Sequence, residues 1–138
     1  MVYGLMTYIK SLNKIARLTP QPLQATFPAH RLFYEGQFNM IHSSSDRANE
    51  IIRFHIDRCR AILDIIDDKS TSIEEIAIQY FPPHLLKGMG KTMAQNEIMA
   101  HIEIMEKCGD ICWVGGNGEV VQHTRSNTCL SIIEEYLL

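Results

Sequence analysis

The stretch from Lys91 to Gly109, KTMAQNEIMAHIEIMEKCG, constrains the fold of this chain most. Its apolar residues recur at three- and four-residue steps, which places them on one side of an α-helix. Gly109 follows the last apolar turn, and glycine readily adopts the left-handed geometry that closes a helix. The next residues, DICWVGGNGEVVQH, contain two β-rich runs around a glycine-rich turn, which predicts a hairpin. The apolar positions of the helix are Met93, Ala94, Ile98, Ala100, Ile102 and Met105.

Two further helices are predicted upstream of this unit. A long helix runs to about Asp67, and either Ser45 or Asp46 can cap its start. Ser72 and Glu75 have the spacing of a capping box, which opens a short helix that continues through Tyr80. The order of helix, short helix, longer helix and hairpin predicts a winged helix-turn-helix. On the long helix the pattern predicts an apolar face of Ile51, Ile52, His55, Ile56, Cys59, Ile62, Leu63 and Ile66, and an outer face of Arg47, Arg53, Asp57, Arg58, Arg60 and Asp64.

The two ends of the chain lie outside this unit. A helix is predicted from about Val2 to Leu18, a brief strand from Leu23 to Phe27, and then an aromatic segment without a clean period. With so little regular structure, residues 1–44 cannot form a hydrophobic core of their own. We therefore expect them to pack on another part of the protein or on a partner. The tail after Ser126 or Asn127 is a further helix candidate, which would dock on its own domain or on a second subunit and leaves a homodimer open. We therefore divide the chain into residues 1–44, 45–125 and 126–138.

Composition narrows the classes of protein to which the chain can belong. Its 138 residues, 46% of them hydrophobic, can bury one sizeable core. No apolar run approaches the roughly 18 to 20 residues of a membrane span, and the first residues carry neither a basic leader nor a cleavage site, so we expect a cytoplasmic protein that binds no membrane. The cysteines form no CxxC pair, which predicts buried, reduced thiols at Cys59, Cys108, Cys112 and Cys129.

The charge pattern argues against nucleic-acid binding. The net charge of the chain is -3. The helix that would enter a DNA groove has two basic residues, Lys91 and Lys107, and three acidic residues, Glu97, Glu103 and Glu106. Affinity for DNA comes largely from neutralising phosphates, and these elements lack the basic side chains that do so. The sequence therefore favours a packing or oligomerisation module over a DNA reader.

Four segments together resemble the C-terminal winged-helix domain attached to many metallo-β-lactamase-fold hydrolases. They are RANEIIRFHIDRCRAILDII, STSIEEIA, FPPHLL and AQNEIMAHIEIMEKCGDI. Upstream, YIKSLNKIARL followed by FPAHR is similar to the helix and last core strand of that family, which deliver a Pro-Gly-His-Gly loop. The resemblance extends from Tyr3 to about Arg125. It implies a mainly α fold with a small β-hairpin, a winged helix-turn-helix preceded by a fragment of an α/β metallo-hydrolase fold.

The resemblance carries one residue of the family's chemistry onto this chain, because His30 occupies the position of a metal ligand. The other ligands of the family belong to a His-x-His-x-Asp-His motif, a further histidine and a bridging aspartate, and none of them maps onto this sequence. Ala29 and Arg31 replace the two usual glycines, and an arginine beside a ligand repels a cation. Zinc catalysis needs about three protein ligands, so the site at His30 is incomplete.

The implied function is therefore non-catalytic. We expect no catalytic residue and no cofactor in this chain alone, and zinc or another divalent metal in the complete parent enzyme. The partner of this chain would be the N-terminal catalytic domain of the same protein. The chain would pack against that domain or mediate its oligomerisation. The alternative is a free-standing winged-helix module that binds nucleic acid or protein.

The sequence leaves two roles open for His55. His55 and Cys59 lie one helical turn apart and could seed a metal site. Alternatively, His55 and His101 are partly buried packing residues, each with one ring nitrogen satisfied by a neighbour or by water.

Overall fold

The computed structural model describes residues 4–18, 26–115 and 120–137. This part of the chain is mainly helical with a small β component, as the sequence predicts, and its strands form two small antiparallel sheets. None of its helices is both long enough and apolar enough to span a bilayer. The elements are α1 (Leu5–Arg17), β1 (Phe33–Tyr34), β2 (Gln37–Phe38), α2 (Ser44–Ile66), β3 (Thr71–Ser72), α3 (Ile73–Tyr80), the 3-10 helix η1 (Pro83–Leu86), α4 (Met89–Lys107), β4 (Ile111–Trp113), β5 (Val120–His123) and α5 (Thr128–Glu134).

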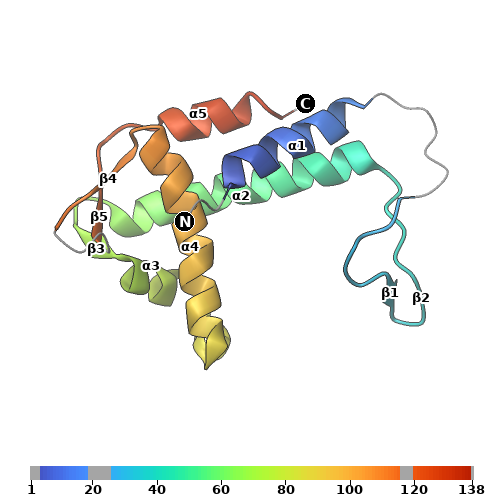
Figure 1. Cartoon of the computed structure of the whole chain (residues 1–138), viewed down its shortest axis with the longest axis horizontal. Coiled ribbons are helices and arrows are strands. Elements are labelled where there is room, and N and C mark those ends of the chain that lie inside the picture. Colours follow the sequence, from blue (N-terminus) through green and yellow to red (C-terminus); the bar gives the residue numbers. More distant parts are fainter. Residues whose placement is uncertain (1–3, 19–25, 116–119, 138) are drawn as a thin grey trace.

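Helix α2 is the central element of the fold, because α1, α3, α4 and α5 all pack on it. In Figure 1, α1 runs alongside α2, α5 lies over the same side, and α4 crosses α2 and extends away from the body. The core between these helices consists largely of isoleucines, including Ile52, Ile62 and Ile66 of α2 and Ile98 and Ile102 of α4, all fully buried. The Ser43 side chain accepts a hydrogen bond from the Asp46 backbone N–H, so Ser43 caps α2 in place of the predicted Ser45 or Asp46.

A three-stranded sheet in the order β3-β5-β4 closes one end of the body. The predicted hairpin strands are β4 and β5, while its turn at 116–119 lies outside the described residues. The strand β3 is not predicted from the sequence, because only two residues form it. These residues, Thr71 and Ser72, pair with Val121 and Val120 of β5. The capping box of Ser72 and Glu75 is present as predicted and starts α3 directly after β3.

A glycine lies beyond each end of helix α4: Gly88 precedes its first residue, and Gly109 follows its C-cap residue, Cys108. Gly109 has a φ of 81°, the left-handed geometry predicted for it. The start differs from the prediction, because α4 begins at Met89 and the expected loop 84–90 contains the 3-10 helix η1. A side chain at Gly90 would place its Cβ 2.1 Å from the carbonyl oxygen of Leu85. Only glycine lets η1 pack this closely on the first turn of α4.

The first helix belongs to the same body as α2 and α5. Ser45 Oγ of α2 donates to the carbonyl oxygen of Ala16 at 3.0 Å, and Asn13 Nδ2 donates to the carbonyl oxygen of Tyr136 at 2.6 Å. Ile9 of α1 is fully buried. The predicted boundary at residue 44 therefore divides segments that pack together in the structure.

Residues 26–42 differ from the rest of the chain. They form an arm, closed at its base by a bridge between Thr26 and Ile41, whose hairpin of β1 and β2 extends away from the helices (Figure 1). Every residue from 31 to 40 is exposed, including Phe33 at 61% and Phe38 at 65%. The strand predicted over Leu23–Phe27 falls mostly outside the described residues.

Helix α5 is anchored by a carboxylate from another element. Asp110, between α4 and β4, is fully buried and accepts the backbone N–H groups of Thr128 at 2.8 Å and Cys129 at 2.7 Å. These donors belong to the first turn of α5, whose own first residues supply no side-chain cap. Asp110 therefore does the capping that the sequence assigns to Ser126 or Asn127.

Candidate functional site

His30 does not assemble a metal site with the rest of the described chain. Its side chain is exposed on the arm, beside Arg31, whose φ of 56° lies in the left-handed region. Within the described residues, the potential metal ligands that gather in a group of three are His55, Glu97 and His101, on α2 and α4. Among the described residues, none gathers with His30 into such a group, so those present do not provide the ligand set that the zinc of the metallo-β-lactamase family requires.

The buried contact between α2 and α4 holds a polar group that we call the histidine cluster: His55, Arg58, Glu97 and His101. His101 Nδ1 donates to the carbonyl oxygen of Glu97 at 2.8 Å, since a carbonyl can only accept. In the neutral ring, Nε2 then carries a lone pair, and His55 Nδ1 donates to it at 3.0 Å. His55 is 8% exposed and His101 is fully buried, so this pair of rings is part of the core.

Burial keeps both rings neutral. Desolvation lowers the pKa of His101 to about 3, although the hydrogen bond to the Glu97 backbone opposes the shift. Desolvation also lowers the pKa of His55, against the attraction of the nearby Glu97 carboxylate. At neutral pH each imidazole therefore presents a lone pair rather than a positive charge.

Arg58 occupies a position that the sequence places wrongly. Its helical spacing predicts the outer face of α2, yet its side chain is only 10% exposed. The guanidinium carbon lies 4.3 Å from the ring centroid of Phe54, and the rings of Tyr80 and Phe81 are 5.2 and 5.6 Å away. Arg58 also forms an ion pair with Glu97, and its Nε donates to Tyr80 Oη at 3.1 Å. The aromatic rings of the α3 end provide a burial site for this cation that residue spacing on α2 alone does not reveal.

Sequence spacing could identify only part of the cluster. Glu97 and His101 lie one turn apart on α4, which is a readable signal for a shared face. His55 lies 46 residues from His101, so only the tertiary packing of α2 on α4 joins them. The ring nitrogen of His55 faces His101, which agrees with the expected packing role and not with the His55–Cys59 pairing.

The cysteines form a separate group, partly as predicted. Cys59 and Cys129 are buried, and Cys129 lies close to Cys59 and Cys108. The interaction with the Cys59 thiol, followed by burial, raises the pKa of Cys129, and burial raises that of Cys108 to about 12. Cys112 is exposed on β4, so the prediction of a buried thiol was wrong there, because alternate side chains of a strand point to opposite faces.

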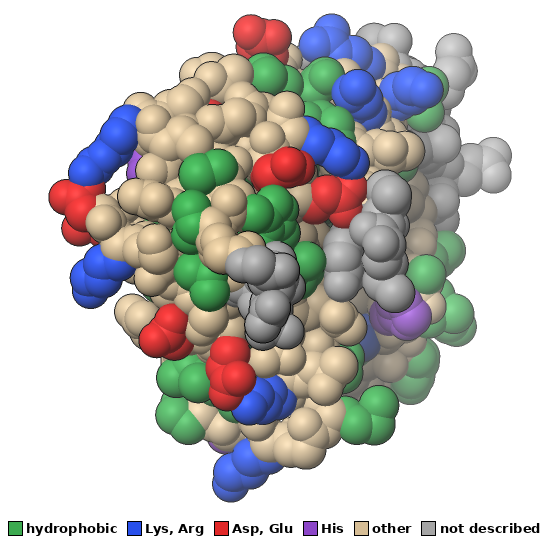
Figure 2. All heavy atoms as spheres, turned by 60° about the vertical axis from the view of Figure 1, so that its left-hand side comes forward, with side chains coloured by type: hydrophobic (Ala, Val, Ile, Leu, Met, Phe, Trp, Pro, Cys, Tyr) green, Lys and Arg blue, Asp and Glu red, His purple; other side chains and the backbone are tan. Residues whose placement is uncertain are grey.

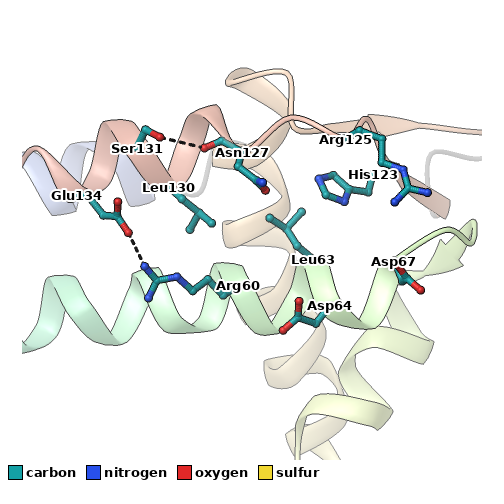
Figure 3. Close-up of a pocket in the computed structure, with 10 residues that line it drawn as sticks. All are labelled: Arg60, Leu63, Asp64, Asp67, His123, Arg125, Asn127, Leu130, Ser131 and Glu134. Atoms are coloured by element: carbon teal, nitrogen blue, oxygen red, sulfur yellow. Dashed lines mark hydrogen bonds and ion pairs between the residues drawn. The ribbon is translucent and has the colours of Figure 1, made fainter.

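A surface cavity of about 480 Å³ lies between the C-terminal half of α2 and α5, with β5 at one end (Figure 3). The side chains of Arg60 and Glu134 meet across it in an ion pair. Arg125, at the β5 end, is ion-paired with Asp68. Both arginines of the lining therefore already have carboxylate partners.

A second cavity, of about 400 Å³, is largely apolar. Phe81, Leu85 and Met93 contribute to its lining, between η1 and the first turns of α4, and Arg58 and Glu97 of the histidine cluster also line it. Met93 is exposed, as is Met89 nearby on the same helix. We call this surface the methionine groove.

No protein-family model, curated protein or solved structure matches this chain. The resemblance to metallo-β-lactamase-fold hydrolases accordingly rests on the residues quoted for it.

Proposed function

We propose that residues 44–123 form a winged helix-turn-helix that serves in protein packing. The order α2, β3, α3, α4, β4, β5 supports this assignment, as does the pairing of β3 with β5, which places β5 in the centre of the sheet. In a winged helix the helix in the position of α4 reads DNA when the protein is a transcription factor.

The charges of α4 support packing rather than DNA reading. Lys91 Nζ lies 2.6 Å from a carboxylate oxygen of Glu74, and Lys107 is paired with Glu103. Acidic and basic side chains are interspersed over the face that carries the sheet and α3 (Figure 2). Lysines that are already ion-paired with carboxylates contribute little to the counterion release that drives binding to nucleic acid.

The observation that carries the proposed function is the exposed arm. A two-stranded hairpin is marginal in water by itself, and exposed aromatic side chains such as Phe33 and Phe38 favour a protein contact. The arm also contains His30, the residue that resembles the last ligand of a metallo-β-lactamase core. We therefore infer that this chain is the non-catalytic C-terminal portion of such a hydrolase, and that the arm packs on its catalytic domain.

Amide hydrogen exchange tests this inference. It is measured over residues 31–40 in the chain alone and in the product of the natural reading frame that encodes it. We expect a His-x-His-x-Asp-His segment upstream, rapid exchange of the arm in the isolated chain, and protection in the longer protein. An upstream frame without that segment, or an arm that exchanges equally fast in both proteins, would contradict the proposal.

Substitutions distinguish the arm from other exposed apolar positions. The double variant Phe33→Ser/Phe38→Ser should weaken association between the chain and the catalytic domain supplied separately. Ile78→Ser is the matched control, because Ile78 is an exposed apolar side chain on α3, away from the arm. Equal weakening by both variants would argue against a specific role of the arm.

The methionine groove favours a second candidate, a free-standing winged-helix module that binds another protein. An exposed apolar groove that includes a flexible methionine, here Met93, is typical of surfaces that receive a partner's apolar side chains. In that case the frame upstream would encode no metallo-hydrolase motif. Met93→Asp would then abolish capture of the partner, while the arm variant would leave it unchanged.

A further inference from the structure

We propose that His55, Glu97 and His101 form a binding site for one zinc ion between α2 and α4. Their potential ligand atoms all lie within 4.8 Å of one another. Two imidazoles and one carboxylate are a ligand set that zinc accepts, with a fourth position left for water. This site is distinct from the position of His30 and does not depend on the proposed parent enzyme.

The two imidazole nitrogens are close to a zinc-binding geometry. His55 Nδ1 and His101 Nε2 are 3.0 Å apart, and the ring centroids are 5.2 Å apart. With Zn–N bonds of about 2.0 Å at tetrahedral angles, the nitrogens would lie roughly 3.3 Å apart and the centroids roughly 5 Å apart. The rings therefore need a rotation, but no separation of α2 from α4, to direct both lone pairs at one ion. The proton on His55 Nδ1 is transferred to Nε2 when the metal binds, so the ring remains neutral and Nδ1 carries the lone pair.

The second nitrogen of His101 is already held as in a metal site. Histidines that bind metals commonly donate their other ring N–H to a backbone carbonyl or carboxylate, which fixes the tautomer and the ring orientation. His101 makes this bond, from Nδ1 to the carbonyl oxygen of Glu97. Because burial keeps the imidazoles of His55 and His101 neutral, no proton has to be removed from a cationic ring before zinc binds.

Arg58 bears on the site in two ways. Its positive charge opposes an incoming cation, which weakens zinc binding. However, Arg58 also rests against the rings of Phe54, Tyr80 and Phe81 and donates to Tyr80 Oη. The guanidinium therefore keeps partners when one oxygen of Glu97 turns toward the metal, and an arginine on the other oxygen holds a ligating carboxylate in place.

Two of the proposed ligands are in contact with the surface. His55, Phe54 and Tyr8 line a surface cavity of about 410 Å³ at the α1 side of α2. Glu97 has 41% of its side chain exposed. We therefore expect zinc to reach the ligands from one of these two surfaces.

Zinc titration of the chelator-treated, full-length chain tests the site, followed by calorimetry and by competition with a chromophoric chelator. We expect one zinc per chain and an affinity reduced at least about tenfold in His55→Gln and in Glu97→Gln, since even partners beyond the ligands commonly contribute that much. His84→Gln is the matched control, because His84 is exposed on η1, and it should bind as the wild type does. Circular dichroism of each variant checks that it is folded.

Cobalt substitution separates this site from binding by thiols. Cobalt bound by two histidines and a carboxylate gives visible d–d bands without the intense near-ultraviolet sulfur-to-cobalt charge transfer that cysteine ligands add. Charge transfer that is lost in Cys112→Ser would assign the metal to the exposed thiol and overturn the proposal. Absence of zinc binding in the wild type, or unchanged affinity in both His55→Gln and Glu97→Gln, would also overturn it.

Discussion

Replacement of Asp110 by alanine should detach α5 from the body. The carboxylate is fully buried and accepts two backbone N–H groups, at 2.8 and 2.7 Å, from the first turn of the helix. Hydrogen bonds to a charged group contribute about 1.5 to 3 kcal/mol each, and a buried donor that loses its partner is costly. Since water can reach the more exposed Thr128 amide, we expect a total loss of about 3 kcal/mol in the free energy of unfolding.

Two further substitutions make the measurement specific. Asp110→Asn retains one acceptor oxygen and should lose about half as much stability as the alanine variant. Asp64→Ala, at an exposed aspartate on α2, is the matched control and should change stability by less than about 0.5 kcal/mol.

Urea unfolding followed by circular dichroism gives these free energies, provided that the slope with denaturant is the same for all variants. Hydrogen exchange at the Thr128 and Cys129 amides should accelerate in Asp110→Ala well before global unfolding. An alanine variant as stable as Asp64→Ala, or unchanged exchange at the two amides, would refute the capping role of Asp110.

Three other outcomes can be measured on the same protein. At pH 8 a disulfide reagent should react rapidly with about one thiol of the folded protein, Cys112, because the raised pKa values and burial of Cys108 and Cys129 suppress their thiolates. After unfolding, all four cysteines should react. Rapid labelling of two or more thiols in the folded protein would contradict this prediction. Gly90→Ala should lower the free energy of unfolding by about 1 to 3 kcal/mol, since its Cβ would overlap the Leu85 carbonyl, and an unchanged urea midpoint would show that η1 moves freely. Fluorescence anisotropy with duplex DNA at physiological salt should give no affinity tighter than about 1 µM, and a tighter, salt-sensitive affinity would show that the paired lysines are available to phosphates after all.

The local signals in the sequence predict the helical framework well. Spacing along the chain predicts α2 and α4, the capping box predicts the start of α3, and Gly109 predicts the end of α4. Each of these signals acts within a few residues, so no knowledge of tertiary packing is needed to read it.

Contacts between distant residues account for what the sequence does not reveal. Arg58 is polar by type and lies in the predicted outer stripe, but the rings of Tyr80 and Phe81, from beyond α2, help to bury it. Asp110 caps a helix that begins 18 residues later. His55 and His101 become neighbours only when α2 and α4 cross. In each case a polar group is satisfied by a partner that no local pattern can specify.

The hydrogen bond between Asn13 and Tyr136 spans 123 residues and joins the first helix to the end of the last. During synthesis, α1 and α2 can form a hairpin early, but the isoleucine core stays open on one side until α5 has been made. Contacts of such large sequence separation slow folding, because much of the chain must be ordered before they form. A nascent chain would therefore present its apolar α1–α2 face to chaperones until nearly all of this sequence has left the ribosome.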